Sequence, residues 1–455
     1  MDLRELTLKE ALLGINEKKF TAADVTKSCL QAIEEKSKLN AYLYINKNEV
    51  NPCEDSLKNL PIAVKDNILT KGIRTTASSK VLEYYLPQYK ETLTERLLEN
   101  NAYIVGKTNM DAWAHGSSTE TSDFGPTLNP WDTTKLPGGS SGGSAAAVSA
   151  DLCIAALGTE TAGSIRQPSS WCGVVGLKPT YGRVSRYGII SMASSTDSPG
   201  PITKCVWDAA FLLSMISGVD PYDATTIGEP SRDYTRGLEN PAKGIKIGIP
   251  KEYLAATNPE VSQKIMDAVK LLENLGCVIK EVSLLDPSFS IAVYTIIQRS
   301  EVSSNLARYD GIRYGNSRDS FGEEAKRRIM LGTYTLSAGY YDAFYKRAER
   351  VRTLIVEDFK RVFREVDLIA GPVSPSVALS VGSSKNHPMF GEVSDALVEP
   401  SSIAGLPGIT VPCGFVENLP VGLGITGPRL SEELILNVAY HYEQSTPWHK
   451  MKPKI

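Results

Sequence analysis

The sequence predicts an α/β protein, because strand-like runs alternate with helical stretches along most of the chain. The strand-like runs are short and rich in branched aliphatic residues, and they lie at 61–64, 102–105, 245–249, 278–282, 366–370 and 409–411. The stretches with apolar residues at helical spacing include 91–100, 259–275 and 343–363. Neither a repeat nor a low-complexity linker divides the 455 residues, so we expect one large domain over 1–455.

The first residues predict two helices. Thr7 and Glu10 have the spacing of a capping box before an apolar stripe, and Thr21 is placed to open a second helix. We therefore expect 1–55 to form a helical segment packed on the domain. The stretch 343–363 is expected to be a long amphipathic helix. Its predicted inner face comprises Phe344, Ala348, Val351, Ile355 and Phe359.

Composition argues against nucleic acid, membrane and disulfide-rich classes. The chain has 49 basic and 52 acidic residues, so it lacks the basic excess of a protein that grips RNA or DNA alone. Its start, MDLRELTLKE, is charged where a signal peptide is apolar. The most apolar stretch, 145–157, is broken by Asp151 and is too short to span a bilayer. We expect a soluble, cytoplasmic protein that does not bind membranes.

Cysteine and histidine usage gives no sign of a metal. The seven cysteines are dispersed without a C-x-x-C pair, which is typical of reduced thiols. The four histidines are too few and too far apart for a convincing zinc site. We therefore expect neither a disulfide framework nor a metal centre.

The first segment with chemical potential is 60–68, LPIAVKDNI, in which Lys65 ends an apolar run. One interpretation is a surface lysine just past a strand. The other is a buried lysine, whose pKa falls because burial disfavours the ammonium form, and which can then act as a base near neutral pH.

The second segment is 136–148, LPGGSSGGSAAAV, which contains Ser140. A flexible linker fits poorly, because the run leads directly into three alanines that favour a helix. Glycines before a helix let backbone N–H groups approach a ligand closely. Residues 138–142 also match G-x-S-x-G, but that nucleophile elbow needs a preceding strand, and the residues before it hold two prolines and no strand pattern.

The third segment is 157–182, in which Ser164 follows a Thr-Glu-Thr-Ala-Gly sequence. Such a turn can aim several backbone N–H groups at one point beside the serine, as an oxyanion hole requires. Taken alone, the segment is equally compatible with a loop between a strand and a helix.

Together, in this order and with 24 residues from Ser140 to Ser164, the three segments resemble the amidase signature family. The resemblance implies a mixed central sheet flanked by helices, and a Ser-cisSer-Lys triad. Matched residue by residue, the triad is Lys65 as base, Ser140 on a cis peptide as proton bridge, and Ser164 as nucleophile. The backbone N–H groups that would hold the oxyanion then belong to Thr161, Ala162, Gly163 and Ser164.

Within that family the chain is most similar to the A subunits of tRNA-dependent amidotransferases. The stretches that carry this similarity are 106–113, 116–132, 174–197, 305–315, 340–355 and 404–414. The resemblance implies that glutamine is hydrolysed here and that ammonia passes to the B subunit, which uses ATP and Mg to activate the carboxylate on tRNA. It also implies a heterotrimer in which the C subunit clamps the two others, no cofactor in this chain, and contact with tRNA only through the complex.

For the glutamine head group, the family's carboxylate-binding arginine matches Arg352, and Glu417 is the candidate for the amine. On spacing alone Arg352 also fits a surface basic cluster, and Glu417 also fits a loop residue. Three other positions depart from the family's usual residues. Ala112 and His115 lie in the stretch NMDAWAHG, and Ala162 stands where glycine is usual, which would cost about 1 kcal/mol if a positive φ were required there.

Two further hypotheses remain open. The chain would be a stand-alone amidase for a small organic amide if glutamine hydrolysis did not depend on partner subunits. A catalytically silent assembly subunit is disfavoured, because all three triad residues are present. Whether glutamyl-tRNA(Gln) or aspartyl-tRNA(Asn) is the acceptor is a property of the partner and is not encoded in this chain.

Overall fold

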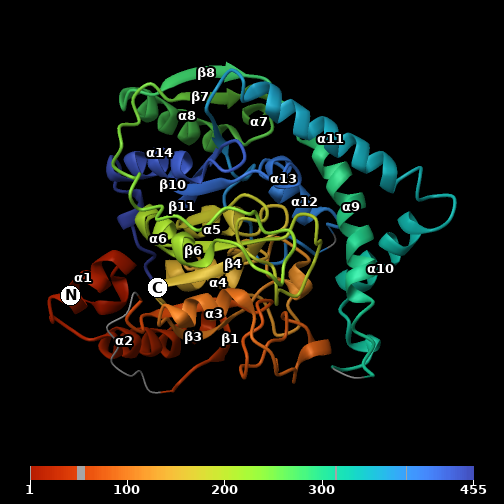
Figure 1. Cartoon of the computed structure of the whole chain (residues 1–455), viewed down its shortest axis with the longest axis horizontal. Helices are drawn as coiled ribbons and strands as arrows, with labels where there is room; N and C mark the ends of the chain where they lie inside the picture. Colours follow the sequence, from red (N-terminus) through yellow and green to blue (C-terminus); the bar gives the residue numbers. More distant parts are fainter. Residues whose placement is uncertain (1, 49–56, 313–314, 386) are drawn as a thin grey trace.

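The computed structural model describes residues 2–48, 57–312, 315–385 and 387–455. Its centre is one mixed sheet of eleven strands in the order β1-β3-β2-β4-β6-β5-β10-β11-β9-β7-β8 (Figure 1). The strands are β1 (Tyr42–Ile45), β2 (Pro61–Lys65), β3 (Tyr103–Thr108), β4 (Ala155–Glu160), β5 (Val175–Lys178), β6 (Ser198–Thr203), β7 (Lys246–Pro250), β8 (Val278–Val282), β9 (Leu368–Pro372), β10 (Gly408–Val416) and β11 (Leu419–Thr426). The predicted α/β class and the mixed sheet are confirmed.

Helices cover the sheet and extend beyond it (Figure 1). They are α1 (Leu8–Asn16), α2 (Ala22–Glu35), α3 (Thr92–Glu99), α4 (Gly142–Ser149), α5 (Arg166–Cys172), α6 (Val206–Ile216), α7 (Lys251–Ala255), α8 (Pro259–Asn274), α9 (Ser288–Leu306), α10 (Glu323–Leu336), α11 (Tyr345–Val362), α12 (Phe390–Asp395), α13 (Glu399–Ile403) and α14 (Glu432–Gln444). No helix in the described ranges is long and apolar enough to cross a membrane.

The alternation of side chains along each strand divides the core into two layers. In β2, Ile62 and Val64 join a cluster that includes residues of α6, α8 and α14, while Ala63 faces a second cluster around α4. Both faces of the strand are therefore buried, as in sheets covered by helices on both sides. This places the end of β2, with Lys65, in the protein interior.

The N-terminal helices form as expected. Thr7 and Glu10 make a reciprocal capping box on α1, and Thr21 makes one with Asp24 on α2. The N–H groups of Leu8 and Lys9, the first two residues of α1, donate to the carboxylate of Asp208 in α6 at 2.8 and 3.1 Å. This contact holds the segment on the domain; residues 49–56 of the predicted segment 1–55 lie outside the described residues.

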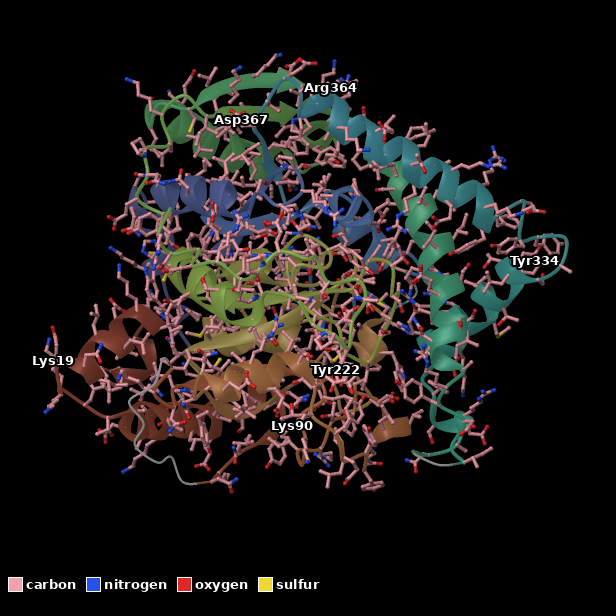
Figure 2. All side chains as sticks on the ribbon, viewed as in Figure 1. Lys19, Lys90, Tyr222, Tyr334, Arg364 and Asp367 are labelled. Carbon is pink, nitrogen blue, oxygen red and sulfur yellow. The ribbon has the colours of Figure 1, made fainter. Side chains whose placement is uncertain are left out.

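Helices α9, α10 and α11 form an arm along one side of the molecule (Figure 1). Figure 2 shows Tyr334 of α10 near its outer end. Gly332 permits the close packing of α10 on α9, because a Cβ there would lie 1.9 Å from the carbonyl oxygen of Arg299. On α11, the predicted inner-face residues Ala348, Ile355 and Phe359 are buried.

The strand that the sequence hides best is β6, which lies between β4 and β5 in the sheet. It is not among the strand-like runs of the sequence, and it contains Pro199 and Pro201, which lack the N–H that pairs in a ladder. Its pairing with β4 nevertheless places Ser198 beside Glu160, at the edge of the sheet where the candidate site lies.

Candidate active site

Lys65 ends β2 between the neighbouring strands β3 and β4. Its side chain is fully buried, and Nζ lies 2.7 Å from Ser140 Oγ and donates to the carbonyl oxygen of Thr159 at 3.1 Å. Burial lowers the pKa of Lys65 to about 7, although nearby carboxyl groups, first Asp111 and then Asp197, oppose the shift. The amine can therefore be neutral near pH 7 and accept a proton from Ser140.

Ser140 follows a cis peptide bond, Gly139–Ser140, just before α4. Gly139 N donates to Gln167 Oε1 at 3.0 Å, which fixes the turn from its other side. A Cβ on Gly139 would lie 2.1 Å from a carboxylate oxygen of Asp111, so only glycine allows this close approach. The residues before the turn form no strand, in agreement with the rejection of a nucleophile elbow.

Ser164 lies in the loop between β4 and α5, beside the Ser140 turn. The N–H of Ser141 donates to the carbonyl oxygen of Ser164 at 3.1 Å, which joins the two segments through their main chains. Ser164 is 4% exposed, and Ser140 is fully buried. The structure thus brings all three predicted triad residues together: a buried amine, a buried hydroxyl and a more accessible hydroxyl.

The backbone next to Ser164 is free to bind an anion. Within the described part of the chain, the N–H groups of Thr161, Ala162, Gly163 and Ser164 donate to no protein acceptor. Ala162 does not have a positive φ, so alanine causes no backbone strain where the family usually has glycine. A Cβ on Gly163 would lie 2.6 Å from Asp395 Oδ1, so packing, rather than φ, requires glycine there.

A buried ion pair that the sequence motifs did not assign to the site shapes this loop. Glu160 accepts the N–H groups of Ile165 and Arg166, both at 2.9 Å, and its carboxylate pairs with the Arg166 guanidinium at 2.6 Å. Arg166 also donates to Ser401 and Ser402 of α13 at 2.9 Å. Glu160 therefore closes the loop around Ser164; the clue in the sequence was an acid and an arginine flanking the serine.

Arg352 reaches the neighbourhood of the site from α11. Its guanidinium donates to the carbonyl oxygens of Ile403 and Ser195 and to Ser195 Oγ, each at 3.1 Å. The side chain is 20% exposed, and Nη1 also forms an ion pair with Glu349 Oε1 at 3.7 Å. Arg352 is therefore not simply part of a surface basic cluster, although it does not contact the triad.

The assignment of Glu417 to the substrate amine is contradicted by its position. Glu417 is exposed, with φ +50°, in the two-residue turn that joins β10 to β11. The other end of β10 is the one near the site, because a Cβ on Gly408 would lie 2.8 Å from Arg166 Nη1. Glu417 lies nine positions after Gly408 along the strand, which is roughly 30 Å at the usual rise. Glu417 is near the segment 404–414 in the sequence, but the length of the β10–β11 hairpin places it far from Arg166 and the site.

The two unusual residues of NMDAWAHG, Ala112 and His115, are both buried. Ala112 is buried in the core between the arm and the site loops. His115 is 1% exposed, and burial holds the pKa of its ring well below the usual range, so the imidazole is neutral. It lines a cavity of about 220 Å³ together with Ser117, which donates to Asp395 at 2.8 Å.

The remaining candidates for other chemistries are structural. The six cysteines in the described ranges are free and buried; the seventh, Cys53, lies outside them. Burial raises the pKa of both Cys172 and Cys413, so neither is a ready thiolate. Among the described residues no group of three or more His, Cys, Asp or Glu side chains is arranged to hold a metal ion.

The fold and the site define an amidase. The family model described as Amidase matches residues 16–436, and this chain belongs to that family. It is 50% identical to the glutamyl-tRNA(Gln) amidotransferase A subunit of Thermodesulfovibrio yellowstonii and 48% identical to that of Halothermothrix orenii, over 100% of both chains in each case.

A solved structure agrees with these relatives. The chain superimposes on the crystal structure of the glutamyl-tRNA(Gln) amidotransferase A subunit from Thermotoga maritima with a TM-score of 0.88 and 41% sequence identity. The match covers 100% of this chain and 98% of that one. The predicted resemblance to the amidase signature family and to these A subunits is confirmed.

Proposed function

We propose that this chain is the glutaminase subunit of a tRNA-dependent amidotransferase. It hydrolyses glutamine and supplies ammonia that converts Glu-tRNA(Gln), or Asp-tRNA(Asn), to Gln-tRNA or Asn-tRNA, a carbon–nitrogen ligation used in protein biosynthesis. The observation that carries the proposal is the identity of 41–50% to A subunits over 100% of this chain and at least 98% of theirs. That similarity favours the amidotransferase over a stand-alone amidase.

The chemistry follows from the triad geometry. Neutral Lys65 takes a proton from Ser140, and Ser140 takes one from Ser164, which attacks the carbonyl carbon of the glutamine side chain. The oxyanion is held by the N–H groups of residues 161–164. The proton returns to the leaving nitrogen, ammonia departs, and water hydrolyses the acyl-enzyme to release glutamate.

The partner and cofactor assignments belong to the same proposal. The B and C subunits of the amidotransferase would complete a heterotrimer, with ATP and Mg used by the B subunit and tRNA bound only through the complex. The chain's net charge of −3 supports this division, because the chain lacks the basic excess that tRNA binding alone requires. We propose that the complex works in the cytoplasm.

A complex carrying Ser164→Ala tests the proposal. It should lose glutamine-dependent transamidation yet still amidate mischarged tRNA when free ammonium is supplied, because only ammonia generation is removed. The isolated wild-type chain should hydrolyse glutamine feebly and be stimulated by the B and C subunits. Full-rate hydrolysis of small amides by a chain that neither binds nor responds to those subunits would instead identify a stand-alone amidase.

A further inference from the structure

Thr161 is the first residue of the loop 161–164, whose N–H groups are the candidate oxyanion donors (the oxyanion loop). Its side chain is held by a buried acid that the proposed mechanism does not use. Thr161 Oγ1 donates to Asp197 Oδ1 at 2.7 Å. Asp197 is 4% exposed and also accepts the N–H groups of Met192 at 2.9 Å and Ala193 at 3.2 Å. One carboxylate therefore connects the oxyanion loop to a second loop, residues 192–197.

The 192–197 loop is fixed by the arm. From α11, Arg352 donates to both the carbonyl oxygen and Oγ of Ser195 at 3.1 Å. From α9, Glu301 accepts the N–H of Ser195 at 2.9 Å, and Asn305 donates to the carbonyl oxygen of Met192 at 3.1 Å. Arg352 therefore both holds Ser195 and is the candidate that binds the substrate carboxylate.

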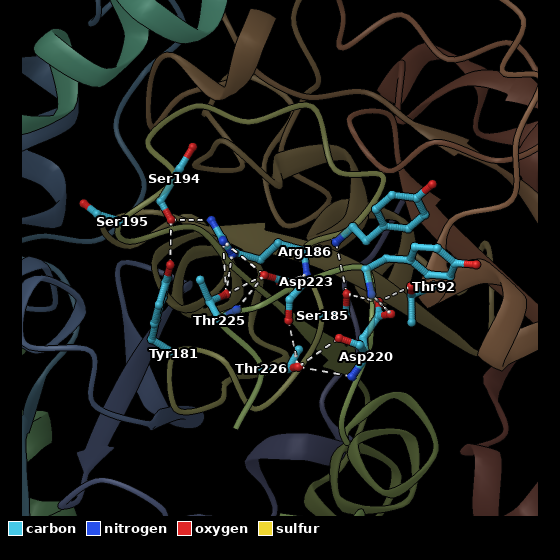
Figure 3. A network of polar contacts seen from close by, with 12 residues as sticks. Thr92, Tyr181, Ser185, Arg186, Ser194, Ser195, Asp220, Asp223, Thr225 and Thr226 are labelled. Carbon is cyan, nitrogen blue, oxygen red and sulfur yellow. Dashed lines mark hydrogen bonds and ion pairs between the residues drawn. The ribbon is translucent and has the colours of Figure 1, made fainter. Parts of the chain in front are cut away.

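The other side of the loop rests on a polar network (Figure 3). Tyr181 OH donates to the carbonyl oxygen of Ser194 at 2.8 Å, and the Arg186 guanidinium donates to the same oxygen. The Arg186 N–H donates to Asp223 at 2.8 Å, so the network is itself anchored. Hydrogen bonds therefore hold the 192–197 loop from both sides, and Ser195 lies two residues before Asp197.

We propose that Asp197 is a positioning residue which, through the Thr161 hydroxyl, aligns the oxyanion loop and couples it to occupation of Arg352. A carboxylate bound by Arg352 competes for the guanidinium that holds Ser195, and the 192–197 loop transmits the change to Thr161. The coupling rests on the proposed function, since it takes Arg352 as the carboxylate site. The positioning role of Asp197 does not rest on the proposed function, because it requires only the hydrogen bonds that Asp197 accepts from Thr161, Met192 and Ala193.

The positioning role is tested by the rate at which a neutral fluorophosphonate labels Ser164. When the serine attacks phosphorus, negative charge develops on the phosphoryl oxygen, as it does on the carbonyl oxygen of an amide. Thr161→Val removes the hydroxyl while nearly keeping the shape, and it should slow labelling by about 10- to 100-fold, as small misplacements at a reacting centre do. Thr161→Ser keeps a hydroxyl and should restore most of the rate. Thr26→Val is the matched control, because Thr26 is a buried threonine of α2 whose hydroxyl has no partner among the described residues. Unchanged labelling of Thr161→Val would overturn the proposal.

The coupling is tested with two substrates in the assembled complex. Thr161→Val should lower kcat for glutamine by a larger factor than kcat for a small neutral amide, with KM for glutamine changed less than kcat. Equal losses of kcat on the two amides would overturn the coupling. If the wild-type complex hydrolyses the neutral amide but not glutamine, the proposed function fails, while the labelling experiment still decides the positioning role.

Discussion

Lys65 and Ser140 are 75 residues apart in the chain, yet Lys65 Nζ lies 2.7 Å from Ser140 Oγ in the protein interior. The contact exists because β2 ends where the glycine turn before α4 begins. In the proposed mechanism Lys65 is the base and Ser140 relays the proton, so a change in either side chain should lower the reactivity of Ser164.

Replacing Lys65 with arginine should abolish most activity. A guanidinium keeps the charge but does not deprotonate in proteins, so the general base is lost and kcat should fall by at least about 100-fold. Lys107→Arg is the matched control, since Lys107 is also fully buried, on the adjacent strand β3, and contacts Thr75 rather than the triad. Thermal unfolding of both variants checks folding. Near-normal turnover of Lys65→Arg would make Lys65 a structural residue.

Activity should rise with pH through about 7 and level off above it, because the pKa of Lys65 is lowered to about 7 by burial. Below that pH the lysine is an ammonium and cannot accept the Ser140 proton; above it the amine is neutral and active. A profile of kcat/KM from about pH 5.5 to 9, which reports on the free enzyme, measures this directly. Activity that is flat across pH 7, or that falls as the pH rises, would contradict a neutral-lysine base.

A glutamine-like diazo-ketone should label Ser164, as detected by peptide mass spectrometry. The serine is 4% exposed beside free N–H groups, whereas Cys172 and Cys413 are buried thiols with raised pKa values. Ser164→Ala should remove the label. Labelling of either cysteine would replace the serine mechanism with a thiol mechanism.

Arg352→Ala should weaken the use of glutamine far more than that of a small neutral amide, if the Arg352 guanidinium binds the glutamine carboxylate. Arg350→Ala is the control, because Arg350 lies on the same helix but is exposed. Equal losses on the two substrates would make Arg352 a residue that only holds Ser195. Steady-state kinetics on both amides separates these results. Glu417→Gln should change the use of neither glutamine nor the neutral amide, because Glu417 lies at the far turn of the β10–β11 hairpin.

Arg166→Met should destabilise the protein strongly. It leaves Glu160 buried without its cation, and breaking such a pair typically costs on the order of 3–5 kcal/mol of unfolding free energy. The control is Arg361→Met, which breaks an exposed pair with Asp358 and should change stability far less. Urea titration of the two variants gives the comparison; similar midpoints would show that the Glu160–Arg166 pair does not hold the loop.

The sequence alone predicted the α/β class and the long periodic helices, and its resemblance to a family named the triad residues, whose catalytic roles stay a prediction. Capping boxes, helical periodicity and runs such as 278–282 are local signals, and the strand there has those bounds. The candidates Lys65, Ser140 and Ser164 could be named because each lies in a short motif that resembles a family's pattern, and the structure brings the three residues together. Each of the three motifs can be recognised in the sequence because its residues are adjacent in the chain.

Only the tertiary structure decided what depends on segments far apart in the sequence. Strand β6 was not recognised from the sequence because it contains two prolines, and its place in the sheet follows from pairing with β4 and β5. Glu417 was misplaced because a motif gives neighbours along the chain but not the length of the hairpin that carries it. The links of Glu160 to α13 and of Thr161 to Asp197 join residues 242 and 36 positions apart. Such contacts are set by how β4, β6 and the arm pack, because burial and hydrogen bonding act on distance in space rather than on order in the chain.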